Sequence, residues 1–208
     1  MRVVLRFFIL TCLLFPTSAL AASILLFGDS IVAGYGLPAE TAMSVQLQRI
    51  LAEKGTDVTV INGGVSGDTT TGGRNRLEWM LNKYKPDAMI LALGGNDLLQ
   101  GVDPTVTREN IHAMLKTARE NRIPTALVAV RAPLNYGLDY AKKFDAIFPE
   151  LARQYSIPLH PFFLESVYGK PAFMQADGIH PNAKGAELIS QELALFLMKE
   201  GLLSKPIK

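Results

Sequence analysis

The sequence ILLFGDS, residues 24 to 30, is the stretch from which the rest of the chain can be interpreted. The apolar residues Ile24 to Phe27 predict a short buried strand that ends at Gly28. Asp29 and Ser30 follow at a chain reversal, and a helical pattern comes next. Open α/β sheets bind ligands at the C-terminal ends of their strands, and helix N-termini favour negative charge there. We therefore interpret Ser30 as a candidate nucleophile that needs a base, an orienting acid and an oxyanion hole.

The first 21 residues have the features of a cleaved secretory signal peptide. Arg2 and Arg6 make the start basic, and Phe7 to Pro16 form an apolar core. Ala19-Leu20-Ala21 is a small-x-small cleavage site, and the apolar run is short for a membrane anchor of about 20 residues. The only cysteine, Cys12, lies in this leader, so the mature chain would have no disulfide or thiol chemistry. We expect an exported protein, periplasmic or secreted, without a stable membrane anchor after cleavage.

The composition predicts one folded domain over residues 22–208. Hydrophobic residues make up 49% of the chain and charged residues 19%, which is typical of a globular protein and unlike a disordered one. Without the two arginines of the leader, 19 basic residues balance 19 acidic ones. The sequence has no cluster of lysine and arginine of the kind that binds nucleic acid, so we expect no nucleic-acid partner.

Short apolar runs alternate with longer amphipathic stretches, which predicts a three-layer α/β/α sandwich with a doubly wound parallel sheet. The nearly all-apolar runs are typical of central parallel strands. The expected strands are 24–27, 58–61, 88–93, 126–130 and 157–159. Five helices are expected. The first has Val45, Leu47, Ile50 and Leu51 on its apolar face, and the second ends before Pro86. The third covers 107–121, the fourth ends near Tyr155 and the fifth ends near Glu200. A glycine- and threonine-rich loop is expected over 62–73.

Histidine is the expected base for a serine nucleophile, because its ordinary pKa lies near neutrality. His112 lies inside an expected helix, where a surface or partly packed role is ordinary. His160 ends the fifth strand on the ligand edge and is a rival candidate. His180 follows Asp177 by three residues, so in a turn the carboxylate can accept from one ring nitrogen while the other faces a serine. The alternative for this pair is a turn that caps the last helix.

Two glycine-rich segments at strand ends fit either plain turns or oxyanion donors. In Gly94-Gly95-Asn96-Asp97 the donor would be the Asn96 amide, and in Gly63-Gly64-Val65-Ser66-Gly67-Asp68 it would be a backbone N–H. Gly73 stands where a phosphate-binding loop needs lysine, which argues against nucleotide binding. The Gly-x-Ser-x-Gly elbow of α/β-hydrolases is absent, and no Cys/His cluster has zinc spacing. We expect neither a metal nor a cofactor.

Taken together, four short blocks resemble the sequence blocks of SGNH (GDSL-type) hydrolases, in the same order. They are Gly28-Asp29-Ser30, Ser66-Gly67-Asp68, Gly94-Gly95-Asn96-Asp97 and Asp177-Gly178-Ile179-His180-Pro181-Asn182. The resemblance extends from about Ile24 to the final helix and is strongest to the secreted bacterial acyl-CoA thioesterase I, lysophospholipase and arylesterase group.

The resemblance implies a flavodoxin-like five-stranded SGNH fold and a Ser-His-Asp triad. It implies Ser30 as nucleophile, His180 as base and Asp177 as the residue that orients the base. It also implies an oxyanion hole made by the N–H groups of Ser30 and Gly67 and the side-chain amide of Asn96. The other carboxylates of the blocks are expected to fix loops, and they are Asp29, Asp68 and Asp97.

The expected substrates are small-molecule carboxylic esters and acyl thioesters, hydrolysed by a monomer through an acyl-enzyme. Pro133, Leu134 and Tyr136 follow a strand on the ligand edge, so they are candidates for lining an acyl groove. The aromatic segment from Pro161 to Ala176 either joins this groove or packs in the core. The alternatives are a carbohydrate O-acetylesterase and, in another class, a noncatalytic binding module of the cell envelope.

Overall fold

The structure is a computed structural model that describes residues 22–202, so the expected signal peptide lies outside the described residues. Five strands form one fully parallel sheet in the order β2-β1-β3-β4-β5. The strands are β1 (Ala22–Gly28), β2 (Val58–Gly64), β3 (Ala88–Ala92), β4 (Thr125–Val128) and β5 (Leu159–His160). This is the flavodoxin-like order, which confirms the fold expected from the sequence.

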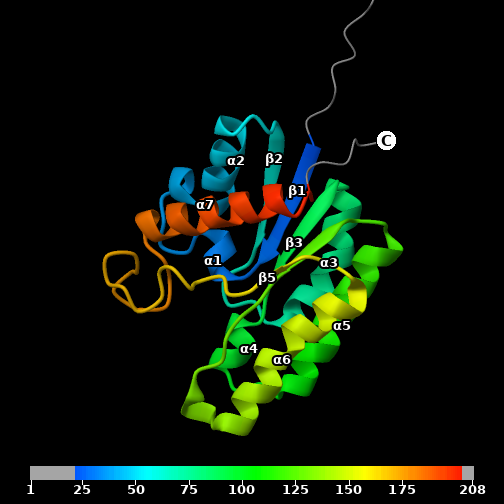
Figure 1. Cartoon of the computed structure of the whole chain (residues 1–208), viewed down its shortest axis with the longest axis vertical. Helices are drawn as coiled ribbons and strands as arrows, with labels where there is room; N and C mark the ends of the chain where they lie inside the picture. The colour runs from blue at the N-terminus through cyan, green and yellow to red at the C-terminus, as the bar shows by residue number, and fades with distance from the viewer. Residues whose placement is uncertain (1–21, 203–208) are drawn as a thin grey trace, which may run out of the picture.

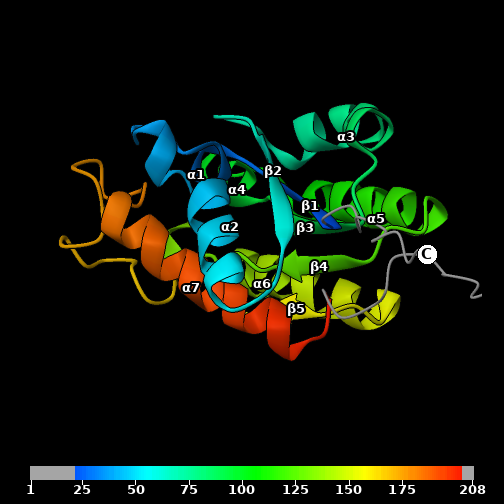
Figure 2. The same cartoon turned by 90° about the horizontal axis from the view of Figure 1, so that it is seen from above.

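Helices cover both faces of the sheet (Figure 1). They are α1 (Ser30–Ala33), α2 (Met43–Glu53), α3 (Thr70–Tyr84), α4 (Gly95–Leu99), α5 (Pro104–Glu120), α6 (Leu138–Tyr155) and α7 (Ala183–Lys199), with 3-10 turns η1 (Ala39–Thr41) and η2 (Leu134–Tyr136). Seen from above, α2 and α7 lie on one side of the sheet and α3 and α5 on the other (Figure 2). The three layers predicted from the alternating pattern are therefore present.

Alternate residues of each strand enter different cores, because side chains along a strand point to opposite faces. Ile24 and Leu26 of β1 pack in the core under α2 and α7. Leu25 and Phe27 pack in the core under α3, α5 and α6. Since all strands are parallel, their C-terminal ends meet at one edge, and the polar segments that follow them meet there too.

Two element boundaries near the site differ from those expected. The strand β2 continues through Gly64 and α3 begins at Thr70, so the predicted loop over 62–73 is reduced to five residues. The side chain of Thr69 accepts from the Gly72 N–H and caps α3, which is why the helix begins before the glycines end. The segment Gly94–Asp97 is the start of the short helix α4 and not a tight turn.

Three other expectations also change. The helix α5 begins at Pro104, three residues before the predicted start, because Asp103 caps it and proline suits a first helical turn. The strand β5 is Leu159–His160, shifted from the predicted 157–159. Val45 does not belong to the apolar face of α2, since it is 47% exposed while the other predicted members are buried.

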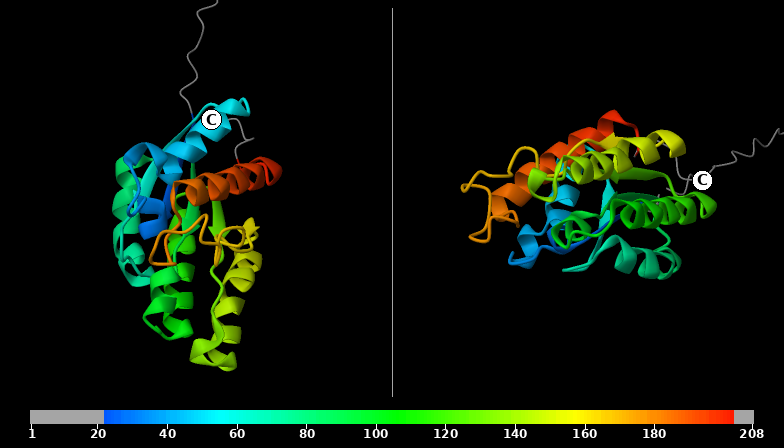
Figure 3. Two further views of the ribbon diagram at one scale, coloured as in Figure 1. Left: turned by 90° about the vertical axis from the view of Figure 1, so that its left-hand side faces the viewer. Right: turned by 90° about the horizontal axis from the view of Figure 1, so that it is seen from below.

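The connection between β5 and α7 is long and extends beyond the layered body, as its yellow-to-orange ribbon shows (Figure 3). An antiparallel bridge between Met174 and Pro181 closes the turn that carries His180. The side chain of Gln175 donates to the carbonyl of Tyr35 at 2.7 Å, which ties this turn to the end of α1. These contacts place a late segment of the chain beside the tip of the first strand.

Candidate active site

Ser30 is the first residue of α1, directly beyond the C-terminal end of β1, and is 8% exposed. The side chain of Asp29 accepts the Ile31 N–H at 3.1 Å and caps this helix. A Cβ on Gly28 would lie 2.7 Å from the carbonyl oxygen of Ala92, so only glycine fits at the junction. The tight change from strand to helix therefore holds the serine hydroxyl at the edge of the sheet.

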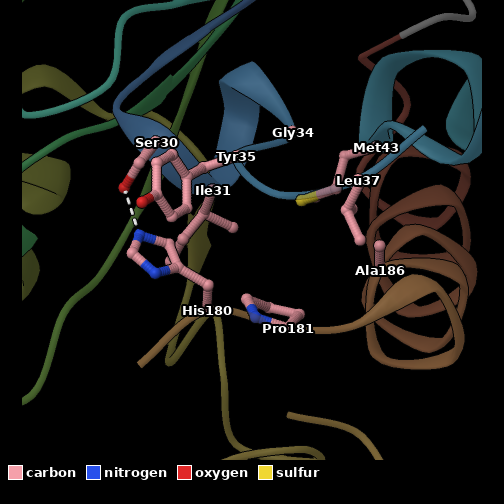
Figure 4. A pocket seen from close by; sticks show the side chains of 9 residues that line it. All are labelled: Ser30, Ile31, Gly34, Tyr35, Leu37, Met43, His180, Pro181 and Ala186. Carbon is pink, nitrogen blue, oxygen red and sulfur yellow. Dashed lines mark hydrogen bonds between the residues drawn. The ribbon is translucent and has the colours of Figure 1, made fainter. Parts of the chain in front are cut away.

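Ser30, His180 and Asp177 form a continuous hydrogen-bonded chain. His180 Nε2 lies 2.8 Å from Ser30 Oγ, the contact drawn in Figure 4, and His180 Nδ1 lies 2.7 Å from Asp177 Oδ2. An ionised carboxylate can only accept, so the ring nitrogen beside Asp177 must carry a proton. The other ring nitrogen is then free, in the neutral imidazole, to accept the serine proton.

The carboxylate of Asp177 is held in its ionised form. The backbone N–H of His180, the ring of His180 and the backbone N–H of Ile179 all donate to it, at 3.0, 2.7 and 2.9 Å. In that order of importance, these hydrogen bonds lower the pKa of Asp177 from 3.8 to about 2. An anion at this position orients the imidazole and stabilises the positive charge that the ring acquires on taking a proton.

The imidazole ring of His180 also packs against the ring of Tyr35. The rings of Tyr35 and His180 lie 4.6 Å apart and are inclined by 39°. Figure 4 shows Tyr35 beside the hydrogen bond between Ser30 and His180. The small pocket around this contact is completed by Ile31, Gly34, Leu37, Met43, Pro181 and Ala186. This packing restricts rotation of the imidazole and favours the orientation that meets the serine.

Of the three predicted oxyanion donors, Ser30 and Asn96 are in the first turns of the short helices α1 and α4, and Gly67 is in the loop after β2. Asn96 is in the first turn of α4, and its Nδ2 donates one hydrogen to the carbonyl of Asp68 at 2.9 Å. Its second amide hydrogen has no acceptor among residues 22–202. Gly67 lies next to Asp68 with φ of +79°, a conformation that favours glycine. Within the part of the chain that the structure describes, nothing accepts the N–H of Ser30 or Gly67.

The remaining carboxylates of the four blocks hold loops in place, as the resemblance implies. Asp97 is fully buried and accepts the N–H and hydroxyl of Thr70 and the hydroxyl of Thr107. Asp29 is buried, and burial raises its pKa to about 6 even though the Ile31 N–H favours its anion. Asp68 is paired with Arg76 at 2.7 Å.

A cavity of about 470 Å³ opens beside Ser30, Asn96 and His180. Of the predicted groove residues, Pro133 and Tyr136 line it and Leu134 does not. The apolar part of its wall also contains Leu98, Leu99, Val130, Ala132, Phe162, Leu164, Tyr168 and Ile179. Pro133, Asn135 and Tyr136 line the wall, whereas Leu134 is 68% exposed to solvent.

The aromatic segment after β5 divides between the two roles considered for it. Phe162 and Tyr168 line the cavity, whereas Phe163 and Met174 are buried in the core under α2 and α7. A smaller pocket of about 60 Å³ shares Phe162 with this cavity and is lined mainly by apolar residues of β3 and β4 and of the segments that follow β4 and β5. The region beside Ser30 is therefore suited to an apolar ligand group.

Of the three histidines, only His180 is hydrogen-bonded to Ser30. The rival His160 packs edge-on against Phe196 at 5.2 Å, and burial lowers its pKa. His112 is on α5, where its Nδ1 lies 3.1 Å from the hydroxyl of Tyr155. Of the two candidates that the sequence left open, His180 therefore has the contact with Ser30 that a base requires, and His160 does not.

One residue beside the site was not indicated by the sequence. Arg76 of α3 donates to the carboxylate of Asp68 and to the carbonyls of Gly28 and Gly63. A single arginine within a helix belongs to no motif, so only the fold reveals this contact. Among residues 22–202, no group of three or more His, Cys, Asp or Glu is placed to bind a metal, and no helix is long and apolar enough to span a bilayer.

A flavodoxin-like sheet with a serine, a histidine and a carboxylate hydrogen-bonded in series at its C-terminal edge is an arrangement suited to a hydrolase. The chain belongs to the GDSL-like Lipase/Acylhydrolase family, whose sequence pattern matches residues 26–188. It is a member of a hydrolase family with esterases and thioesterases among its relatives.

Three relatives illustrate the similarity. An arylesterase of Vibrio mimicus is 40% identical over 184 residues, which cover 86% of this chain and 92% of the relative. Thioesterase 1/protease 1/lysophospholipase L1 of Escherichia coli (strain K12) is 38% identical over 190 residues, covering 91% and 89%. The crystal structure of the psychrotrophic esterase EstA from Pseudoalteromonas sp., inhibited by monoethylphosphonate, aligns with a TM-score of 0.81 at 33% identity, covering 85% of this chain and 97% of that one.

Proposed function

We propose that this chain is a serine hydrolase that cleaves carboxylic esters and acyl thioesters through an acyl-enzyme on Ser30. The observation that carries the proposal is the series of hydrogen bonds from Asp177 through His180 to Ser30, at the wall of a largely apolar cavity. Relatives named arylesterase and thioesterase 1/lysophospholipase L1 support the same class of substrate.

In the proposed reaction, Ser30 Oγ attacks the acyl carbon while His180 Nε2 takes the hydroxyl proton. The N–H groups of Ser30 and Gly67 and the amide of Asn96 donate to the oxyanion of the tetrahedral intermediate. The C–O or C–S bond then breaks, His180 gives its proton to the leaving alcohol or thiol, and the acyl group stays on Ser30. Water, deprotonated by His180, attacks this ester by the same route and releases the carboxylic acid.

The residues that line the cavity favour a substrate with an apolar acyl chain over the alternative, an acetylated carbohydrate. Its wall beside Ser30 presents mostly aliphatic and aromatic groups, with Pro133, Tyr136 and Phe162 among them. Apolar surface stabilises an acyl chain in proportion to the area removed from water, whereas sugar hydroxyls buried there would lack partners. Leu134 stays a candidate contact only for the outer part of a substrate.

We also propose that residues 1–21 are removed on export and that residues 22–208 act as one domain and as a monomer. Ala22 already belongs to β1, so cleavage after Ala21 retains every residue of the strand that the structure describes. The mature protein would then work in the periplasm or outside the cell, without a cofactor.

A hydrolysis panel tests this function. The mature chain is assayed against p-nitrophenyl esters and acyl-CoA thioesters of graded length, lysophospholipids and acetylated xylan, with Ser30→Ala as the matched control. We expect hydrolysis of acyl esters and thioesters by the wild type and none by the variant. Activity confined to acetylated xylan would support the carbohydrate alternative, and inertness towards the whole panel would support the noncatalytic one.

A further inference from the structure

Arg76 is a partly buried cation that no part of the proposed mechanism uses. Its side chain is 20% exposed and its guanidinium lies 3.9 Å from the centre of the Phe27 ring. Three nitrogens donate to three different segments: Nε to the carboxylate of Asp68 at 2.7 Å, Nη1 to the carbonyl of Gly63 at 2.8 Å and Nη2 to the carbonyl of Gly28 at 2.9 Å. One rigid fork therefore joins the ends of β1 and β2 to the loop that follows β2.

Two of these three contacts lie within two residues of a proposed donor for the oxyanion. Gly28 precedes the turn that presents Ser30, and Asp68 directly follows Gly67. The carbonyl of Asp68 accepts the Asn96 amide at 2.9 Å, so Asp68 is bonded to Arg76 at one end and to Asn96 at the other. A single hydrogen-bond network centred on Arg76 and Asp68 thus connects the segments that carry all three donors.

The ion pair between Asp68 and Arg76 lies in a closely packed, largely buried place. A Cβ on Gly72 would lie only 1.9 Å from Asp68 Oδ1, so the carboxylate occupies space that any other residue at this position would fill. The carboxylate is 9% exposed, and a charge-assisted hydrogen bond at such a site is stronger than one at the surface. A lysine at position 76 has the charge but lacks the planar fork that reaches three acceptors.

We propose that Arg76 is a positioning residue that sets the alignment of the Gly67 and Asn96 donors relative to Ser30. This inference rests on the proposed function and names a residue that the reaction needs although it touches neither substrate nor reacting atoms. Loss of the fork leaves substrate binding in the apolar cavity intact but misplaces the donors. Its effect therefore falls on turnover rather than on KM.

The test compares Arg76→Lys and Arg76→Ala with Arg74→Ala, a control two residues away on α3 that loses one hydrogen bond, to Asn110. With a soluble short-chain ester, we expect kcat to fall about 10-fold or more in Arg76→Lys and ~10²-fold in Arg76→Ala, with KM nearly unchanged. Millimolar methylguanidinium should restore part of the kcat of Arg76→Ala and leave Arg76→Lys and the control unaffected. Wild-type kcat in both Arg76 variants would overturn the inference.

A second measurement separates this inference from the proposed function. Hydrogen exchange of peptides that span Gly63 to Thr69 should be faster in both Arg76 variants than in the wild type or in Arg74→Ala. Unchanged exchange in that segment would overturn the positioning role of Arg76, whether or not the wild type hydrolyses esters. A wild type that hydrolyses no ester would overturn the proposed function, independently of the exchange result. A fall in kcat that only follows a fall in folded protein by circular dichroism, without rescue by methylguanidinium, would also overturn it.

Discussion

At the scale of single residues, the site contains two carboxyl groups with opposite environments. Asp177 accepts three hydrogen bonds, which lower its pKa to about 2. Asp29 is buried and accepts the Ile31 N–H, and burial raises its pKa to about 6. The difference agrees with the roles proposed for them, because an Asp177 that is ionised near neutral pH can orient His180, whereas Asp29 caps α1 and its burial disfavours its anion.

The raised pKa of Asp29 makes a prediction about stability. A carboxyl group whose pKa is higher in the folded than in the unfolded protein stabilises the folded state while it is protonated. This stabilisation by Asp29 is fully present below the ordinary pKa of 3.8 and is lost as the pH rises through about 6. Asp29→Asn retains an oxygen to accept the Ile31 N–H but does not ionise. Relative to the wild type, its free energy of unfolding should therefore rise by up to about 3 kcal/mol between about pH 4 and pH 7. Urea unfolding at several pH values measures this, and parallel curves for the two proteins would contradict it.

Asn96 gives a second prediction at this scale. Asn96→Ala removes one proposed donor to the oxyanion, and such a loss lowers turnover by about 10² to 10³. KM should change little, since the donor acts mainly on the transition state. Steady-state kinetics and a melting curve measured together decide the matter. Full activity in a folded variant would make Asn96 only a structural residue of α4.

At the scale of secondary-structure elements, the site depends on close junctions between strands and helices. The last residue of β2, Gly64, pairs with Gly28 at the end of β1. A Cβ on Gly64 would lie 2.1 Å from the backbone nitrogen of Ala33 in α1. The first helix, which begins with Ser30, can therefore approach the sheet only because this position has no side chain.

Gly64→Ala should push α1 away from β2. Because this contact is with backbone, which cannot rotate away, we expect a loss of stability of at least about 1–3 kcal/mol and a fall in kcat from displacement of Ser30. Thr59→Ala, an exposed position on the same strand, is the control and should cost less than about 1 kcal/mol with normal kcat. Denaturant unfolding and kinetics of both variants provide the test. Wild-type values for Gly64→Ala would show that α1 is not held by this contact.

Element types were predictable from the sequence, whereas several boundaries were not. The apolar runs after Ala22 and Ala88 predict buried strands because burial on both faces leaves no room for polar residues. The start of α3 depends on a cap by Thr69, and that of α5 on a cap by Asp103. These short-range hydrogen bonds override the impression of a loop that glycine and threonine give.

At the scale of the whole molecule, the parallel sheet explains why residues 150 positions apart meet at 2.8 Å. The sequence predicts that Ser30, Asn96 and the Arg131–Gly137 segment share the sheet edge, because each follows a strand. It does not predict that Leu134 misses the cavity, nor that Arg76 reaches three segments. Those depend on where the folded chain places η2 and α3 relative to the site, which is set by packing rather than by local pattern.

The proposed mechanism depends above all on Ser30 being the nucleophile of this hydrolase. The most direct measurement is the intact mass of the protein after treatment with a fluorophosphonate, followed by peptide mapping. We predict a single adduct per chain, on the peptide that contains Gly28-Asp29-Ser30, and none in Ser30→Ala. An adduct that persists in Ser30→Ala, or a wild-type protein that stays unlabelled while folded, would contradict a nucleophilic Ser30.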